Sequence, residues 1–133
     1  MPILLVVLQN AYAKTAKRER QLKKYDLYLK ALWASHTGRR LLEMLPDGWD
    51  VHIINASPKI GRKPSSVFRP DVMHVKRMFE QTQPDVVLGC GRTAHSALNS
   101  LGISYIAAPH PAWRLLSKGI TANIKRAIME EFN

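Results

Sequence analysis

The segment DVVLGCGRTAHSAL, residues 85–98, decides the fold class. It begins with the short apolar run DVVLG, which predicts a strand over residues 85–89, turns at Gly89 and Gly91, and leads into a helical pattern that runs from Thr93 to Leu101. Continuous apolar runs that alternate with helices are typical of parallel strands covered on both faces. Gly102 follows the helical pattern at a position that suits a helix C-cap. The segment therefore predicts a strand–turn–helix unit of an α/β protein.

The rest of the chain repeats this alternation. Three more apolar runs, ILLVV, VHII and ISYIAA, predict strands over residues 3–7, 51–54 and 103–108. Helical spacing predicts helices over residues 22–33, 37–45, 72–82, 93–101 and 120–132, the third of them capped by Asp71 and closed by Pro84. The order β-α-α-β-α-β-α-β-α predicts a three-layer α/β/α sandwich with a four-stranded, mostly parallel sheet. At 133 residues, we expect a single domain spanning 1–133.

The charge of the chain indicates its class of partner. Lys and Arg number 20 against 10 Asp and Glu, so the formal net charge is +10. An excess of this size on a small domain favours a polyanion, and nucleic acid is the first candidate. A solubility charge or an acidic protein partner is the alternative. Basic residues concentrate in KTAKRERQLKK (14–24) and again at Lys59, Arg62 and Lys63.

The sequence has few of the features that form disulfides, metal sites or membrane spans. A single cysteine, Cys90, excludes an internal disulfide and a cysteine-based zinc site, which fits a reducing cytoplasm. The five histidines lack metal-ligand spacing, so we expect neither a metal nor a cofactor. The apolar run near the start is too short to span a membrane and has the wrong flanks for a signal peptide. We expect a cytoplasmic monomer with no membrane contact.

Ligands of open parallel sheets bind at the carboxyl ends of the strands. The segment GCGRTA (89–94) matches the dinucleotide-binding fingerprint, but no acidic residue follows about 20 positions later to hold a ribose. The glycines then serve a tight turn, or the helix that begins near Arg92 meets a phosphate. No serine lies in a G-x-S-x-G elbow either.

Three polar side chains, Asn10, Asn55 and His110, each follow a predicted strand and should share this edge of the sheet. An Asn amide carries donors and an acceptor, which suits it to the edge of a nucleobase. A histidine followed by proline can donate a hydrogen bond to an oxygen that gains negative charge.

Four segments in chain order resemble motifs of the uracil-DNA glycosylase superfamily: LQNAY (8–12), INAS (54–57), VLGCGRTAHSAL (87–98) and HPAWRLLS (110–117). The resemblance implies a small α/β/α sandwich that flips a uracil-like or modified pyrimidine base out of DNA and hydrolyses its N-glycosidic bond. Asn10 would orient the water, Asn55 would bind the base, and His110 would stabilise the departing base. Tyr12 would stack on the base.

The resemblance also implies DNA contacts. Trp113 or Arg114, with Leu115, would fill the gap left in the base stack, although Trp113 could instead anchor the last helix in the core. Ser117 and Lys118 would contact phosphate. The remaining expected DNA contacts are Lys14, Lys59, Arg62, Lys63 and Arg92. No lysine is placed for a Schiff base, so we expect no lyase step.

The sequence departs from the family pattern at several positions. The family's first motif contains Gly and Pro, which LQNAY (8–12) lacks. The family's last motif has Ser after His-Pro, where this chain has Ala112. Two other functions stay open: a catalytically inactive protein of the same fold that binds DNA and recognises a base, and an enzyme acting on free nucleosides or nucleotides. The small size would suit a phage or mobile-element gene.

Overall fold

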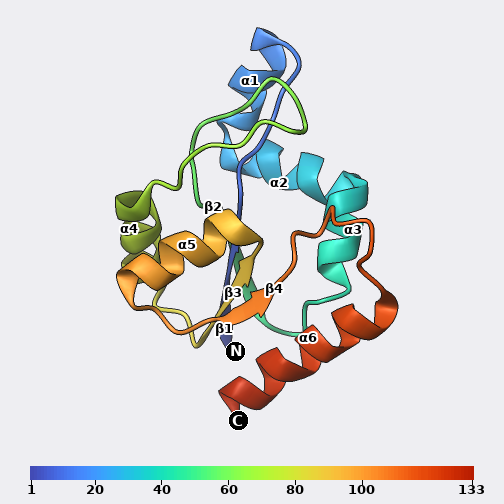
Figure 1. The fold of residues 1–133 in the computed structure, drawn as a ribbon, viewed down its shortest axis with the longest axis vertical. Helices are drawn as coiled ribbons and strands as arrows, with labels where there is room; N and C mark the ends of the chain where they lie inside the picture. Colours follow the sequence, from blue (N-terminus) through green and yellow to red (C-terminus); the bar gives the residue numbers. More distant parts are fainter.

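The computed structural model describes all residues from Met1 to Asn133. In chain order the elements are β1 (Ile3–Leu8), α1 (Ala16–Leu22), α2 (Tyr25–Ala34), α3 (His36–Leu42), β2 (Asp50–Asn55), α4 (Val72–Thr82), β3 (Val86–Cys90), α5 (Arg92–Leu101), β4 (Ile106–Ala108) and α6 (Lys118–Phe132). The four strands form one parallel sheet in the order β2-β1-β3-β4. The predicted α/β/α sandwich is confirmed (Figure 1).

The apolar runs form strands because the sheet is covered on both faces. In the central strand β1, the side chains of residues 4–8 are all buried. On one face, α2, α3 and α6 pack on a core that includes Leu4, Val6 and Ile128. On the other face, α4 and α5 pack on a core that includes Leu5 and Leu98. Helix α1 lies beyond the carboxyl end of the sheet (Figure 1).

The helix expected over residues 22–33 is confirmed as α2, which begins at Tyr25, whereas the preceding helix α1 was not expected. The chain forms two helices, α1 and α2, which are separated at Lys23 and Lys24, so the fold has six helices rather than five. A tertiary contact fixes the start of α2, because the Tyr25 hydroxyl donates to the carbonyl of Ile53 at 2.9 Å. The same hydroxyl accepts from the amide of Ile53 at 3.1 Å. β2 is an edge strand, so the Tyr25 hydroxyl bonds the N–H and C=O groups of Ile53 that a neighbouring strand would otherwise bond.

Other element bounds differ from the prediction because of helix caps. The fourth strand begins at Ile106 rather than at residue 103, since the backbone amides of Gly102 and Ile103 donate hydrogen bonds to the carbonyls of Asn99 and Leu98 and close α5. Helix α6 begins at Lys118, two residues early, because the Ser117 hydroxyl accepts from the amide of Ile120. Helix α3 begins at His36 and already ends at Leu42.

The predicted caps of α4 and α5 are confirmed. Asp71 accepts from the amide of His74, and α4 ends with Gln83 in the left-handed conformation, directly before Pro84. Gly102 ends α5 with φ +67°. None of the helices is both long and apolar enough to cross a bilayer.

The connection from β3 to α5 requires two glycines, Gly89 within β3 and Gly91 in the turn. A Cβ at Gly89 would lie 2.9 Å from the Leu98 side chain and 3.0 Å from Tyr105, so Gly89 allows α5 to pack on the strand. Gly91 has φ +89°, which favours glycine. Gly91 therefore fits the interpretation that it serves a tight turn, whereas Gly89 serves the packing of α5 on β3.

Candidate functional site

Asn10, Asn55 and His110 lie at the carboxyl edge of the sheet, at or just beyond the ends of β1, β2 and β4. We call this edge the strand-end rim. Since β2 and β4 are the outer strands, the rim spans three strand spacings, about 14 Å between the backbones. The structure therefore places the three side chains along one edge, with Asn10 between the other two.

Asn10 carries an acceptor that the protein leaves unpaired. Its Nδ2 donates to the carbonyl of Ala11 at 3.0 Å. Its Oδ1 is buried and has no hydrogen-bond partner. An unpaired buried acceptor costs about 1–3 kcal/mol, so such groups in native proteins usually bond a water or a ligand. Asn10 is suited to hold a water or a ligand N–H group at the end of β1.

His110 is held as a neutral hydrogen-bond donor. The amide of Ala112 donates to its Nδ1 at 3.0 Å, so in the neutral ring Nε2 carries the proton. Burial lowers the pKa of His110 below its ordinary value of 6.5, which favours that neutral form. The ring lies beside the N-terminus of α5, where a Cβ on Gly91 would be 3.4 Å from the His110 Cβ. The spare Nε2–H is available to an oxygen of a ligand.

Asn55 lines a cavity of about 350 Å³ at the outer edge of β2, which we call the edge cavity. Its walls come from α1, α2, β2, α4 and the segments that follow β1, α1 and β2. They consist of Ala11, Leu22, Lys23, Tyr25, Tyr28, Ile53, Ile54, Asn55, Pro58, Ile60, His74 and Met78. Inside it, the Tyr28 hydroxyl donates to the Asn55 Oδ1 at 3.4 Å. The cavity does not include His110, so Asn55 and His110 serve different parts of the rim.

The long loop 56–70 is fastened to the segment after β1. The amide of Gly61 donates to the carbonyl of Ala11 at 2.9 Å, and the amide of Ala13 donates to the carbonyl of Gly61 at 2.7 Å. These bonds form an isolated bridge between Gly61 and Tyr12, whose side chain is exposed. The bridge holds the part of the loop that contains Lys59, Arg62 and Lys63 beside α1.

The loop lies beside α1 at the carboxyl end of the sheet (Figure 1), and we call the exposed basic residues of these two segments the basic platform. It consists of Lys14, Lys17, Arg18, Arg20, Lys23, Lys24, Lys59, Arg62 and Lys63. Arg62 pairs with Glu19 of α1 at 3.4 Å. The Lys59 Nζ lies 5.9 Å from the centre of the Phe68 ring. The expected DNA contacts in this part of the chain thus lie on α1 and on the segments next to it.

The loop after β4 presents its apolar side chains to solvent. Trp113 is 42% exposed and Leu115 is 66% exposed, so the alternative that Trp113 anchors the core is wrong. Arg114 is also exposed, whereas Leu116 is buried. Arg40 of α3 donates to the carbonyl of Leu116 and fastens the loop to that helix.

The other expected DNA contacts are spread over the rim. Arg92 is the exposed first residue of α5 and stands beside the turn at Gly91. Ser117 caps α6, so its hydroxyl oxygen already accepts a hydrogen bond. Lys118 is exposed at the start of α6, where it lines a second pocket.

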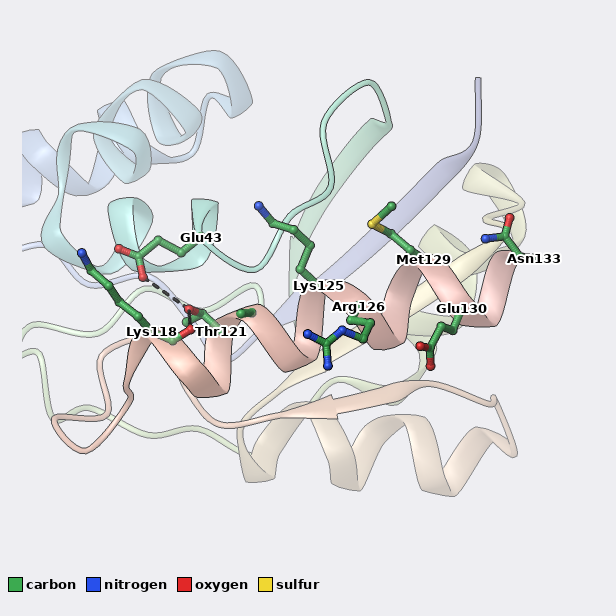
Figure 2. A pocket seen from close by; sticks show the side chains of 9 residues that line it. Glu43, Lys118, Thr121, Lys125, Arg126, Met129, Glu130 and Asn133 are labelled. Atoms are coloured by element: carbon green, nitrogen blue, oxygen red, sulfur yellow. Dashed lines mark hydrogen bonds between the residues drawn. The ribbon is translucent and has the colours of Figure 1, made fainter.

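That second pocket is a wide groove of about 710 Å³ along the outer surface of α6. Figure 2 shows that its side chains spread along the helix and do not converge on a point. It mixes the basic Lys118, Lys125 and Arg126 with the acidic Glu43 and Glu130. We therefore place the candidate site at the strand-end rim and the edge cavity.

Sequence reasoning missed the residues that support the site through distant contacts. Tyr28 meets Asn55 across 27 positions, and Glu19 meets Arg62 across 43. No local sequence pattern predicts pairs so far apart in the chain. No group of three or more His, Cys, Asp or Glu side chains is placed to hold a metal ion.

No family model, curated protein or solved structure matches the chain. The resemblance to uracil-DNA glycosylases therefore stays a prediction from the sequence motifs.

Proposed function

We propose that the protein is a monofunctional DNA glycosylase that hydrolyses the N-glycosidic bond of a flipped, uracil-like or modified pyrimidine base. The observation that carries the proposal is the state of His110. A neutral ring whose Nδ1 accepts from Ala112 presents an N–H donor at Nε2. A donor of this kind stabilises negative charge as it develops on a carbonyl oxygen of a departing base.

The reaction requires a water molecule and a leaving base. The bond between the sugar C1′ and the base nitrogen breaks, and the water oxygen forms the new bond to C1′. The electron pair goes to the base, where His110 Nε2–H donates to the oxygen that gains charge. The Oδ1 of Asn10 has no partner in the protein but is sealed from solvent, so the end of β1 would have to open for this oxygen to accept from the water and orient it. The water proton leaves with the base or to solvent, because an amide takes up no proton at neutral pH.

Two surfaces beside the rim suit a DNA strand. The basic platform would bind phosphates, and the exposed Trp113 and Leu115 would fill the space that a flipped base leaves. Removing a base from the stack costs a few kcal/mol, which such contacts offset.

A second candidate function is base recognition without catalysis. The observation that favours it is the chemistry at the end of β1, where an amide stands and no carboxylate is available to take a proton from water. Such a protein would bind DNA with the same salt dependence and release no base.

The test is base release from single- and double-stranded oligonucleotides that carry uracil, mismatched thymine, 5-substituted pyrimidines or hypoxanthine, with alkali to reveal abasic sites. We expect release from at least one substrate, and His110→Ala should abolish it while DNA affinity changes less than about twofold. Binding without release from any substrate would support the second function. Release that survives in His110→Ala would remove His110 from the mechanism.

A further inference from the structure

The edge cavity is separate from the part of the rim that the proposed reaction uses. It lies at the outer edge of β2, and its walls include neither Asn10 nor His110. A ligand held there would not touch the groups that act on the leaving base and the water. The edge cavity is therefore a second place on this protein where a small molecule can bind.

The walls of the edge cavity carry positive charge and no negative charge. Of its 12 wall residues, Lys23 is the only one that is charged at any ordinary pH, and His74 is the only other one that can become positive. None of the walls is Asp or Glu. Burial raises the pKa of Tyr28 to about 12, so this phenol stays neutral at pH 7. The cavity therefore favours an anion, whereas the groove along α6 places Glu43 and Glu130 among its basic side chains.

The positive groups of the cavity are not used by carboxylates of the protein. The two salt bridges of the structure involve other residues, so Lys23 has no acidic partner. The Asp71 carboxylate accepts from the backbone amide of His74 at 3.0 Å, as the cap of α4, and not from the imidazole ring. Both side chains are therefore free to bind a ligand.

The remaining walls suit a flat, apolar ring. The rings of Tyr25 and Tyr28 lie with their centres 6.5 Å apart and their planes tilted by 30°. Both hydroxyls already have hydrogen-bond partners in β2, so these residues offer ring surface to a ligand. Aliphatic surface comes from Leu22, Ile60 and Met78. A volume of about 350 Å³ lies at the small end of the range for ligand pockets, which suits one small ring system.

We propose that the edge cavity binds a small aromatic carboxylate. A single permanent positive charge matches a monoanion, whereas a phosphate monoester carries a charge of about −1.5 to −2. Lys23 would pair with the carboxylate, and a ring N–H of His74 would donate a second hydrogen bond. The aromatic ring would pack against the tyrosines and the aliphatic side chains. This site does not depend on the proposed glycosylase activity, since the two share no residue.

The experiment is an NMR titration of the isotope-labelled protein with benzoate and with benzamide, which has nearly the same shape and no charge. We expect saturable binding of benzoate that is about tenfold tighter than that of benzamide. This is the lower end of the effect of a hydrogen bond between charged groups, because Lys23 is exposed. The largest shifts should fall on the signals of Tyr28, Ile60 and Met78.

Two lysine variants test the source of the preference. Lys23→Gln should reduce the preference for benzoate over benzamide to below about threefold and leave the affinity for benzamide nearly unchanged. Lys24→Gln is the matched control, because it removes the same charge from the next residue, which does not line the cavity. It should leave the preference intact. Both lysines are exposed, so both variants should fold, and the same spectra report whether they do.

Four results would overturn the proposal: no saturable binding of benzoate, equal binding of benzoate and benzamide, shifts confined to residues outside the cavity, or equal losses in the two lysine variants. The last result would mean that benzoate responds to the overall charge of the basic platform. Base release is a separate measurement. His110→Ala should abolish base release and leave benzoate binding unchanged, so the glycosylase proposal and the carboxylate site can fail independently.

Discussion

The protonation of His110 makes the stability of the fold depend on pH. Burial lowers its pKa below 6.5, so the folded protein takes up a proton there less readily than the unfolded chain. The contribution to stability is complete above pH 6.5 and is lost as the pH falls through the lower, folded pKa. Protonation at Nδ1 would also break the hydrogen bond from the Ala112 amide, because two N–H donors would then face each other.

We therefore expect wild-type stability to fall between pH 7 and pH 5 more steeply than that of His110→Gln, which cannot titrate. Urea unfolding at a series of pH values measures this difference. Parallel curves for the two proteins would show that His110 titrates alike in the folded and unfolded states.

The Glu19 carboxylate pairs with Arg62 and, in the proposed complex with DNA, would compete with phosphate for it. The two side chains pair at 3.4 Å and are 28% and 51% exposed, so the pair contributes at most about 1 kcal/mol. Glu19→Gln frees Arg62, and we expect DNA affinity to rise by up to about fivefold at low salt. Fluorescence anisotropy with a labelled oligonucleotide measures the change.

Glu130→Gln controls for net charge, because it removes one negative charge on α6. An equal gain in both variants would mean that overall charge, rather than the release of Arg62, sets the affinity.

At the scale of elements, Gly61 shapes the loop that carries a third of the basic platform, Lys59, Arg62 and Lys63. A Cβ at this position would lie 2.2 Å from the Cβ of Ser66. We expect Gly61→Ala to lower the free energy of unfolding by about 1–3 kcal/mol and to weaken DNA binding, since the bridge to Tyr12 must shift. Urea unfolding and anisotropy measure the two effects.

Two variants test the cause. Gly61→Ala combined with Ser66→Gly removes the clash and should recover most of both losses. Gly119→Ala, whose nearest neighbour would be 3.8 Å away, should leave stability unchanged or raise it. A double variant as defective as Gly61→Ala would show that the contact with Ser66 is not the cause.

The strands were predictable because burial on both faces leaves a local signature. The expected run 3–7 became Ile3–Leu8, and the expected 85–89 became Val86–Cys90. The break between α1 and α2 was not predictable, since Lys23 and Lys24 are good helix formers and the break accompanies the contact of Tyr25 with β2. Tertiary contacts overrode local preference there.

The site was predictable to the same extent. The rule that ligands bind at carboxyl ends of strands selected Asn10, Asn55 and His110, and the structure places them on that edge. It could not give the state of each side chain, because the partners that set it are a backbone amide for His110 and a distant tyrosine for Asn55.

At the scale of the whole molecule, the question is whether the net charge of +10 or its placement governs binding. The basic platform lies at the carboxyl end of the sheet, whereas α6 lies at the opposite end of the molecule from α1 (Figure 1). Lys59→Gln with Lys63→Gln removes two charges from the platform. Lys125→Gln with Arg126→Gln removes two charges from α6. The two double variants therefore have the same net charge as each other.

If the platform contacts phosphates, only the first double variant should lose affinity for duplex DNA. Its slope of log affinity against log salt should become shallower by about 2, since each lost phosphate contact changes the slope by about 0.9. Anisotropy titrations between about 50 and 200 mM salt measure both slopes. Equal changes in the two variants would mean that DNA responds to total charge, and the basic platform would then lose its role in orienting a strand toward His110.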